Sequence, residues 1–81
     1  MKLDYNFVQE LLTKIEEIAD ERTNFMFEWF YDAYPDIDHK VIFYHLKFLC
    51  DNDLCQEANG FIFDWTPKGR EWLDSRKSQK Y

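Results

Sequence analysis

Two histidines and two cysteines are the side chains of this sequence best suited to binding a metal ion: His39, His45, Cys50 and Cys55. A zinc site needs three or four such ligands that converge on one point. His39 and His45 are six residues apart, so they cannot lie on the same face of a helix. We therefore expect no metal site and no other cofactor.

The sequence also lacks the residue patterns of common catalytic sites. It has neither a glycine-rich phosphate loop nor a nucleophile motif. The acidic residues Glu16, Glu17, Asp20 and Glu21 fit the solvated face of a helix better than a pair of catalytic carboxylates. His45 is interpreted as a packed side chain that a local acceptor satisfies. We expect a protein that is not an enzyme and has no small-molecule substrate.

The residues best suited to contacting a macromolecule lie in the stretch HKVIFYHLKFLC, residues 39 to 50. At 100° per residue, Ile42, Leu46 and Leu49 share one face of a helix. The far side carries aromatic rings and lysines, and we expect it to contact double-stranded DNA or a protein. Together with two basic residues further along, the predicted contact residues are His39, Lys40, Phe43, Tyr44, Lys47, Phe48, Lys68 and Arg70.

Three helices can be placed from their start signals. Asp4 is a good N-cap for an amphipathic helix whose apolar residues recur at intervals of three and four. Asp38 can cap a second helix that runs to about Asn52, and Thr66 can cap a third, with Pro67 at its first position and Gly69 allowing a close approach to a neighbour. These signals position the expected contact residues on the second and third helices.

Two further segments have other signals. Asn59-Gly60 favours a type I′ turn, which predicts a β-hairpin over about residues 54 to 65. Residues 25 to 34, FMFEWFYDAY, suit a helix or a strand, and their aromatic density favours a short strand followed by a turn or a single helical turn. The sequence thus predicts an α+β fold, a small winged helix-turn-helix domain of three helices plus a β-hairpin wing. We expect a single domain over residues 1–77 and a flexible C-terminal tail over 78–81.

The chain of 81 residues is acidic, with a net charge of −6. Residues 1 to 35 carry eight acidic and three basic side chains, whereas five basic and two acidic side chains follow from Thr66 onward. No apolar run approaches the roughly 20 residues that span a bilayer, so we expect a cytoplasmic protein that does not bind membranes. Because that compartment is reducing, Cys50 and Cys55 are interpreted as small buried apolar residues.

Three stretches carry a resemblance to a known family: MKLDYNFVQELLTKIEE, YHLKFLCDNDLC and TPKGREWLDSRK. The last two are similar to the "HL..L...L" helix end and the "T.KG..FL" segment that precede and follow the wing of many winged-helix proteins. Together the three resemble a family of short, uncharacterised phage and prophage proteins with a winged-helix fold. The resemblance implies that the recognition helix of DNA-binding relatives corresponds to the helix that holds Tyr44, His45, Leu46 and Leu49, and that Thr66, Gly69 and Leu73 belong to the closing helix.

The chain departs from that pattern where relatives contact DNA. The usual glycine at the helix end is replaced by Asn52-Asp53-Leu54, and Asn52 can take a left-handed cap conformation. The short wing has no arginine and offers Gln56, Glu57 and Asp64 instead. These residues are poorly suited to binding phosphates.

Two functions remain open from the sequence. The first is a small phage-type winged-helix DNA-binding protein, a transcriptional regulator acting as a homodimer. The alternative is an acidic winged-helix protein-interaction module that binds or inhibits a host or phage protein. A helix that reads the major groove usually presents arginine, asparagine, glutamine or serine, whereas residues 39 to 50 present rings and two lysines.

Overall fold

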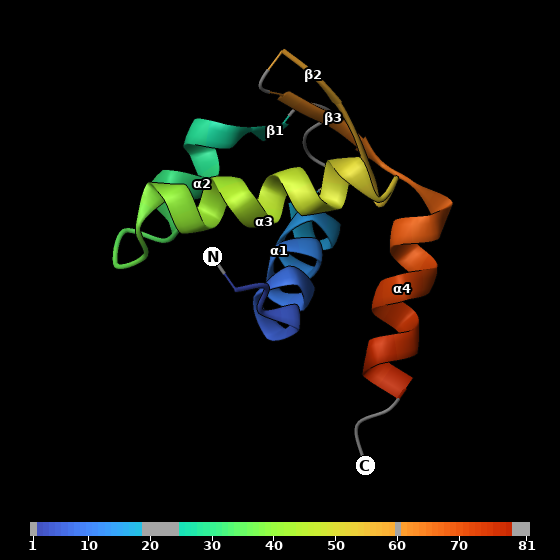
Figure 1. Ribbon diagram of the computed structural model, residues 1–81. Coiled ribbons are helices and arrows are strands. Elements are labelled where there is room, and N and C mark those ends of the chain that lie inside the picture. The colour runs from blue at the N-terminus through green and yellow to red at the C-terminus, as the bar shows by residue number, and fades with distance from the viewer. Residues whose placement is uncertain (1, 19–24, 60, 79–81) are drawn as a thin grey trace.

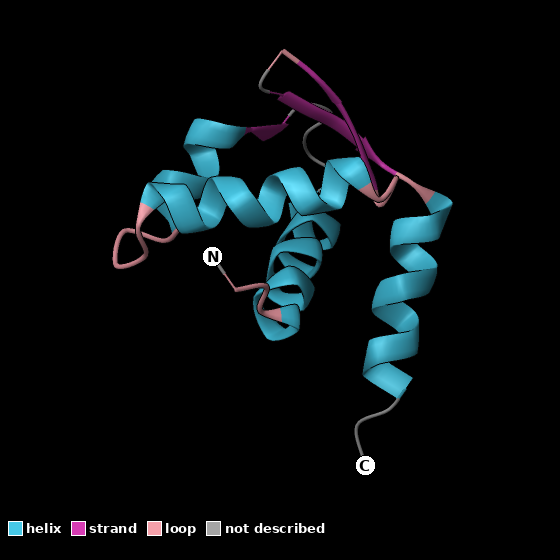
Figure 2. Ribbon diagram, viewed as in Figure 1, coloured by secondary structure: helices cyan, strands magenta, loops and turns pink. Residues whose placement is uncertain are grey.

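The computed structural model describes residues 2–18, 25–59 and 61–78. Four helices and three strands follow one another within these residues (Figures 1 and 2), in the order α1 (Tyr5–Ile18), β1 (Phe25–Met26), α2 (Phe27–Ala33), α3 (His39–Asp51), β2 (Cys55–Ala58), β3 (Phe61–Trp65) and α4 (Pro67–Ser78). The chain is thus a small α+β domain, as the sequence predicts. None of the helices in the described part of the chain has the length and apolar character needed to cross a membrane.

The three predicted N-caps are confirmed. The Asp4 carboxylate accepts a hydrogen bond from the backbone N–H of Asn6 at 2.9 Å, and Asp38 accepts one from Lys40 at 2.8 Å. The hydroxyl of Thr66 accepts one from the backbone N–H of Gly69 at 3.0 Å. Each cap satisfies a backbone N–H that has no partner within its helix, which fixes where α1, α3 and α4 begin.

The predicted hairpin is also confirmed, and a third strand joins it. β2 pairs with β3 in antiparallel register, and β1 pairs with the other edge of β3, so the strand order is β1-β3-β2. Met26 of β1 lies opposite Phe61 of β3. Asn59 has a φ of 51°, in the left-handed region that a type I′ turn requires, while Gly60 lies outside the described residues.

The prediction of three helices is wrong, because residues 27–33 form the helix α2 after the short strand β1. A strand would have directed Phe25, Phe27 and Trp29 to one side. The helix instead buries Phe27 and Phe30, which lie three residues apart, in the core that α3 and the sheet provide. Tertiary burial therefore decides the conformation of a segment whose local sequence suits both.

Two smaller expectations concern the ends of helices. The left-handed conformation expected at Asn52, which has a φ of −103°, lies instead at Asp53, where φ is 61°. The Asn52 side chain donates to the Phe48 carbonyl at 2.9 Å, so it caps the last turn of α3 from a right-handed conformation. Ser78 is the last residue of α4, and residues 79–81 of the predicted tail lie outside the described residues.

The core lies where α1, α3 and α4 meet beneath the sheet (Figure 1). α1 packs onto α3 and α4 through residues that are fully buried: Leu11, Leu12, Ile15, Leu46, Leu49 and Leu73. With this stripe of α3 facing inward, its opposite stripe is left at the surface.

Gly69 fixes the position of α4 against the end of α3. A Cβ atom at this position would overlap the carbonyl oxygen of Leu54, the residue that leads from α3 into the hairpin. The same oxygen accepts a hydrogen bond from the backbone N–H of Thr66 at 3.1 Å, and the Thr66 hydroxyl donates to the carbonyl of Asp53 at 2.5 Å. The close approach predicted for Gly69 is therefore confirmed, and it ties the first turn of α4 to the base of the hairpin.

Candidate functional site

The outer face of α3 is the surface stripe opposite its buried leucines, and it consists of Lys40, Phe43, Tyr44, Lys47 and Asp51. Phe43 is 46% exposed and Tyr44 is 37% exposed, so two large aromatic residues lie at the surface of a helix whose other face forms part of the core. Lys40 and Asp51 are also exposed. α3 lies at the front of the molecule in Figure 1, with the hairpin beside its C-terminal end. The sequence predicted the outward direction of these side chains correctly, because that direction follows from helical periodicity alone.

One of the two lysines on this face is engaged by the hairpin. The Nζ atom of Lys47 lies 2.7 Å from Oε1 of Glu57 in β2, and this hydrogen bond raises the pKa of Lys47. The pair is partly shielded from solvent, so the charge of Lys47 is largely balanced within the molecule. Lys40 has no acidic partner among the residues that the structure describes. The outer face therefore carries less positive charge than its sequence indicates.

His39 and Phe48, two of the predicted contact residues, do not join the outer face. The His39 ring stacks on the ring of Tyr31 in α2, with centroids 4.4 Å apart and planes 9° from parallel. Phe48 is only partly exposed because it packs on the core and its ring lies beside the ring of Tyr5 in α1, with centroids 6.2 Å apart and planes at 80°. Phe48 therefore stabilises the α1–α3 junction and contributes little free surface.

Lys68 and Arg70 also lie apart from the outer face. Both are exposed on the first turn of α4, and α4 begins beyond the C-terminal end of α3 (Figure 1). Lys40, Phe43 and Tyr44 instead belong to the N-terminal half of α3. The guanidinium carbon of Arg70 lies 4.9 Å from the centre of the Trp65 ring, a cation–π contact at the base of the hairpin. The predicted contact residues therefore fall into separate groups instead of one surface.

The other basic residues of α4 are held by α1. Arg76 donates to Asn6 at 2.9 Å and to Gln9 at 3.2 Å, and Lys77 pairs with Glu16 at 2.9 Å. The hydrogen bond with Glu16 also raises the pKa of Lys77. Two of the basic side chains of the C-terminal segment, Arg76 and Lys77, thus hold α4 against α1.

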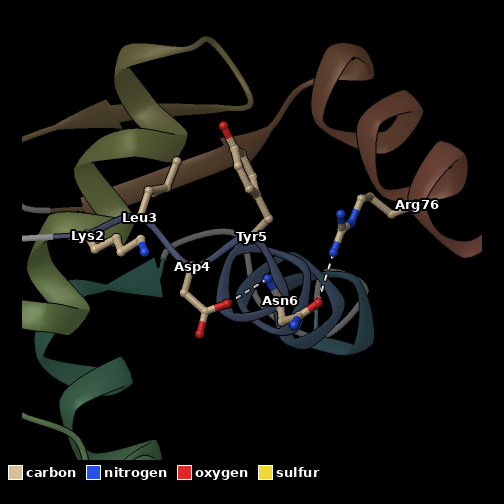
Figure 3. Close-up of a pocket in the computed structure, with 6 residues that line it drawn as sticks. All are labelled: Lys2, Leu3, Asp4, Tyr5, Asn6 and Arg76. Carbon is tan, nitrogen blue, oxygen red and sulfur yellow. Dashed lines mark hydrogen bonds between the residues drawn. The ribbon is translucent and has the colours of Figure 1, made fainter.

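A hollow of about 500 Å³ lies beside this junction, lined by Lys2, Leu3, Asp4, Tyr5, Asn6 and Arg76. Figure 3 shows Arg76 reaching from α4 toward the Asn6 amide at the start of α1. None of the predicted contact residues lines this hollow. Its polar groups serve the contact between two helices, so we assign it a structural role.

A second hollow lies beside β1 and α2, in a region for which the sequence predicted no contact residues. The α2–hairpin hollow, of about 250 Å³, lies between the start of α2 and the tip of the hairpin and is lined by Met26, Phe27, Glu28, Tyr31, Asn59 and Phe61. Met26 and Phe61, opposite each other in the sheet, are 44% and 38% exposed. The ring centroids of Phe27, which lines the hollow, and Phe43 are 5.8 Å apart, so this hollow adjoins the outer face of α3.

His45 is buried at 1% exposure and linked at both ring nitrogens. Its Nδ1 lies 2.7 Å from the Val41 carbonyl, and its Nε2 accepts a hydrogen bond from the backbone N–H of Asp4 at 3.0 Å. The acceptor role of Nε2 requires the neutral ring with its proton on Nδ1. The interpretation of His45 as a packed and satisfied side chain is confirmed, and the residue joins α3 to the start of α1.

The two cysteines are free thiols in apolar surroundings. Burial raises the pKa of Cys50 to about 12 and also raises the pKa of Cys55, so both are protonated near neutral pH. Cys55 is buried, which agrees with its interpretation as a small buried apolar residue, whereas Cys50 is only half-buried. Within residues 2–18, 25–59 and 61–78, no three histidine, cysteine or acidic side chains gather as metal ligands.

Tyr34, the C-cap residue of α2, carries a buried polar atom without a partner. Its hydroxyl oxygen is shielded from solvent and makes no hydrogen bond, while its ring meets Phe7 edge-on at 5.4 Å. Burial, and then the charges of Glu10 and Glu17, raise the pKa of Tyr34 to about 12. The ring is therefore held for its apolar contact with α1.

Comparison with known proteins gives no relative: no family model, no curated protein and no solved structure matches this chain. The resemblance to short phage proteins therefore remains a hypothesis.

Proposed function

We propose that this protein is a winged-helix protein-interaction module that binds a partner protein through the outer face of α3. The winged-helix assignment is supported by the order of the elements. Two helices joined by a short loop, α2 and α3, are followed directly by the hairpin. The strand that precedes α2, β1, pairs with strand β3 of the hairpin. In this assignment α3 is the presented helix and β2–β3 the wing.

The observation that carries the proposal is the exposure of two adjacent rings, Phe43 and Tyr44, on the presented helix. With 46% and 37% of their surfaces exposed, each leaves roughly 80 Å² of mostly apolar area in water. Covering that area would contribute about 2 kcal/mol per ring at ~25 cal/mol per Å². Aromatic residues are enriched at protein interfaces, where rings at the centre of the contact supply much of the affinity.

The charges around these rings favour a protein over DNA. Affinity for DNA depends on lysine and arginine side chains that displace counterions from phosphates. Here Lys47 is paired with Glu57, the hairpin exposes Gln56 and Asp64, and the whole chain carries a charge of −6. These features weaken phosphate binding at the positions where a wing would contribute it.

A small DNA-binding regulator of the phage type is the second candidate, and the order of the elements favours it. A helix pair with an adjacent hairpin is a common way to place a helix in the major groove. Lys40 and Lys68 are exposed cations that could contact phosphates. Titration with random duplex DNA at low salt tests this candidate: a dissociation constant below micromolar with a steep dependence on salt would support it.

The proposal itself is tested by the double substitution Phe43→Ser with Tyr44→Ser. The variant and the wild type are used as bait in cells that make the protein, and self-association is measured by sedimentation. A matched control is Tyr5→Ser, which removes a ring that is 51% exposed on α1. We expect the double variant to stay folded and to lose a partner, or a second copy of itself, that the control retains.

Two outcomes would refute the proposal. If the folded double variant keeps every partner that the wild type binds, the outer face is not the binding surface. If the double variant loses only duplex binding, α3 is a DNA-reading helix.

A further inference from the structure

We propose that the α2–hairpin hollow binds a positively charged side chain, arginine or lysine, that projects from a basic segment of the partner protein. This inference rests on the proposed function and adds the chemistry of the partner. Four apolar or aromatic side chains, one carboxylate and one amide line the hollow: Met26, Phe27, Tyr31, Phe61, Glu28 and Asn59.

The walls suit the long apolar part of a basic side chain. Met26 and Phe61 lie opposite each other on the neighbouring strands β1 and β3, and Phe27 and Tyr31 of α2 also line the hollow. A volume of about 250 Å³ admits one extended side chain but no folded element. Methylene groups of lysine or arginine gain by leaving water for such walls, and aromatic rings attract the charged end through cation–π contacts.

Glu28 decides which kind of side chain fits. It is exposed in the first turn of α2 and has no ion pair or hydrogen bond among the residues that the structure describes. A neutral apolar occupant would remove water from this carboxylate without replacing it, which is costly. An anionic occupant would be repelled, whereas a cation would form a charge-assisted hydrogen bond with it.

The wider charge of this region points the same way. Asp32, one turn after Glu28, is also exposed on α2, and the chain as a whole carries a charge of −6. A partner with a basic segment would be attracted over a distance of about a Debye length, roughly 8 to 10 Å at physiological salt. Charge complementarity therefore selects a basic segment as the occupant.

The hollow is placed so that one partner could use it together with the outer face of α3. The Phe27 ring, which forms one wall of the hollow, meets the exposed Phe43 ring edge-on at 5.8 Å and 71°. A segment that covers Phe43 therefore passes beside the hollow and can insert a side chain there.

The test is a titration of the ¹⁵N-labelled protein with the peptide acetyl-Gly-Arg-Gly-amide, followed by amide chemical shifts. The comparison peptide carries citrulline, which has the shape of arginine without its charge. We expect saturable shifts in the millimolar range at Met26, Glu28, Tyr31 and Phe61, and binding weaker by about fivefold or more for citrulline. Glu28→Gln should weaken arginine binding to a similar extent.

Glu71→Gln is the matched control, because it removes the same charge from an exposed position on α4, at the other end of α3 from α2 (Figure 1). The control should bind the arginine peptide as the wild type does. Absence of saturable shifts in the hollow, equal binding of citrulline, or equal effects of Glu28→Gln and Glu71→Gln would each overturn the inference.

The binding of a cation in the hollow and the proposed function can be refuted separately. If Phe43→Ser with Tyr44→Ser abolishes partner binding while Glu28→Gln changes neither peptide nor partner binding, the outer face binds a protein but the hollow does not take a cation. If the arginine peptide binds in the hollow while the double variant keeps all its partners, the proposed function is wrong.

Discussion

Replacing Gly69 by alanine separates two effects of opposite sign. Alanine favours a helix interior over glycine by about 1 kcal/mol, so at an open position in α4 the substitution would stabilise the protein. At residue 69, however, the new Cβ would overlap the carbonyl oxygen of Leu54. A backbone atom cannot rotate aside as a flexible side chain can, so α4 or the start of the hairpin would have to move.

That movement has a calculable cost. Overpacking in a close-packed interior typically costs about 1 to 3 kcal/mol. The displaced oxygen also accepts the hydrogen bond of Thr66 N–H at 3.1 Å, whose loss costs about 1 kcal/mol more. After the gain in helix propensity is subtracted, we expect Gly69→Ala to lower the free energy of unfolding by about 1 to 3 kcal/mol. Such a loss is large for a domain of this size, which is expected to unfold with only about 4 to 12 kcal/mol.

Urea unfolding followed by circular dichroism at 222 nm measures this difference. Ser75→Ala, an exposed position two turns further along α4, is the control, and it should raise the free energy of unfolding by a few tenths of a kcal/mol. A Gly69→Ala variant as stable as the wild type, or more stable, would refute the close contact between α4 and Leu54.

Four further predictions concern buried groups. Leu46→Ala should lower the free energy of unfolding by about 2 to 5 kcal/mol, measured in the same urea experiment, because Leu46 is fully buried; an unchanged midpoint would show that the inward face of α3 is misassigned. Tyr34→Phe should leave stability unchanged or raise it by up to about 1 kcal/mol, because it removes a buried hydroxyl without a partner; a clear loss would reveal a hydrogen bond at that hydroxyl. Cys50 should react with a thiol reagent at pH 8 much more slowly in the folded protein than in urea, since burial raises its pKa to about 12. Because burial raises the folded-state pKa values of Cys50 and Tyr34, the folded protein resists their ionisation. The free energy of unfolding should therefore not change through these two groups below about pH 9, and it should fall as pH rises toward 12, which alkaline unfolding curves would show.

The parts of this fold that the sequence predicted correctly are those with local causes. The caps at Asp4, Asp38 and Thr66 depend on one side chain and a backbone group two or three residues away. The position of the hairpin and the outward direction of Phe43 also follow from neighbouring residues, through turn chemistry and helical periodicity. Signals of this kind can be read without knowing what packs against the segment.

The features that the sequence did not predict depend on residues far apart in the chain. The helix at 27–33 forms because Phe27 and Phe30 find a core built by other elements. Phe48 is partly covered because Tyr5 lies beside it, and the positive charge of Lys47 is balanced by an ion pair with Glu57 in the hairpin. No local pattern encodes these contacts.

The α2–hairpin hollow is the clearest case. It exists because β1 pairs with β3, which brings Met26 next to Phe61, 35 positions further along the chain. The one signal in the sequence was the short strand expected near residue 25, and it did not specify a partner strand or a register.

The central claim is that the outer face of α3 contacts a protein, and site-specific photo-crosslinking tests it most directly. A photoreactive benzoylphenylalanine is placed at position 43 in one version of the protein and at position 5 in another, and each is irradiated in cells that make it. We predict a discrete crosslinked species, a partner or a second copy of the chain, from position 43, and its absence from position 5 and when position 43 is combined with Tyr44→Ser. Crosslinks to nucleic acid from position 43, or no crosslink at position 43 in a folded and abundant protein, would contradict the account.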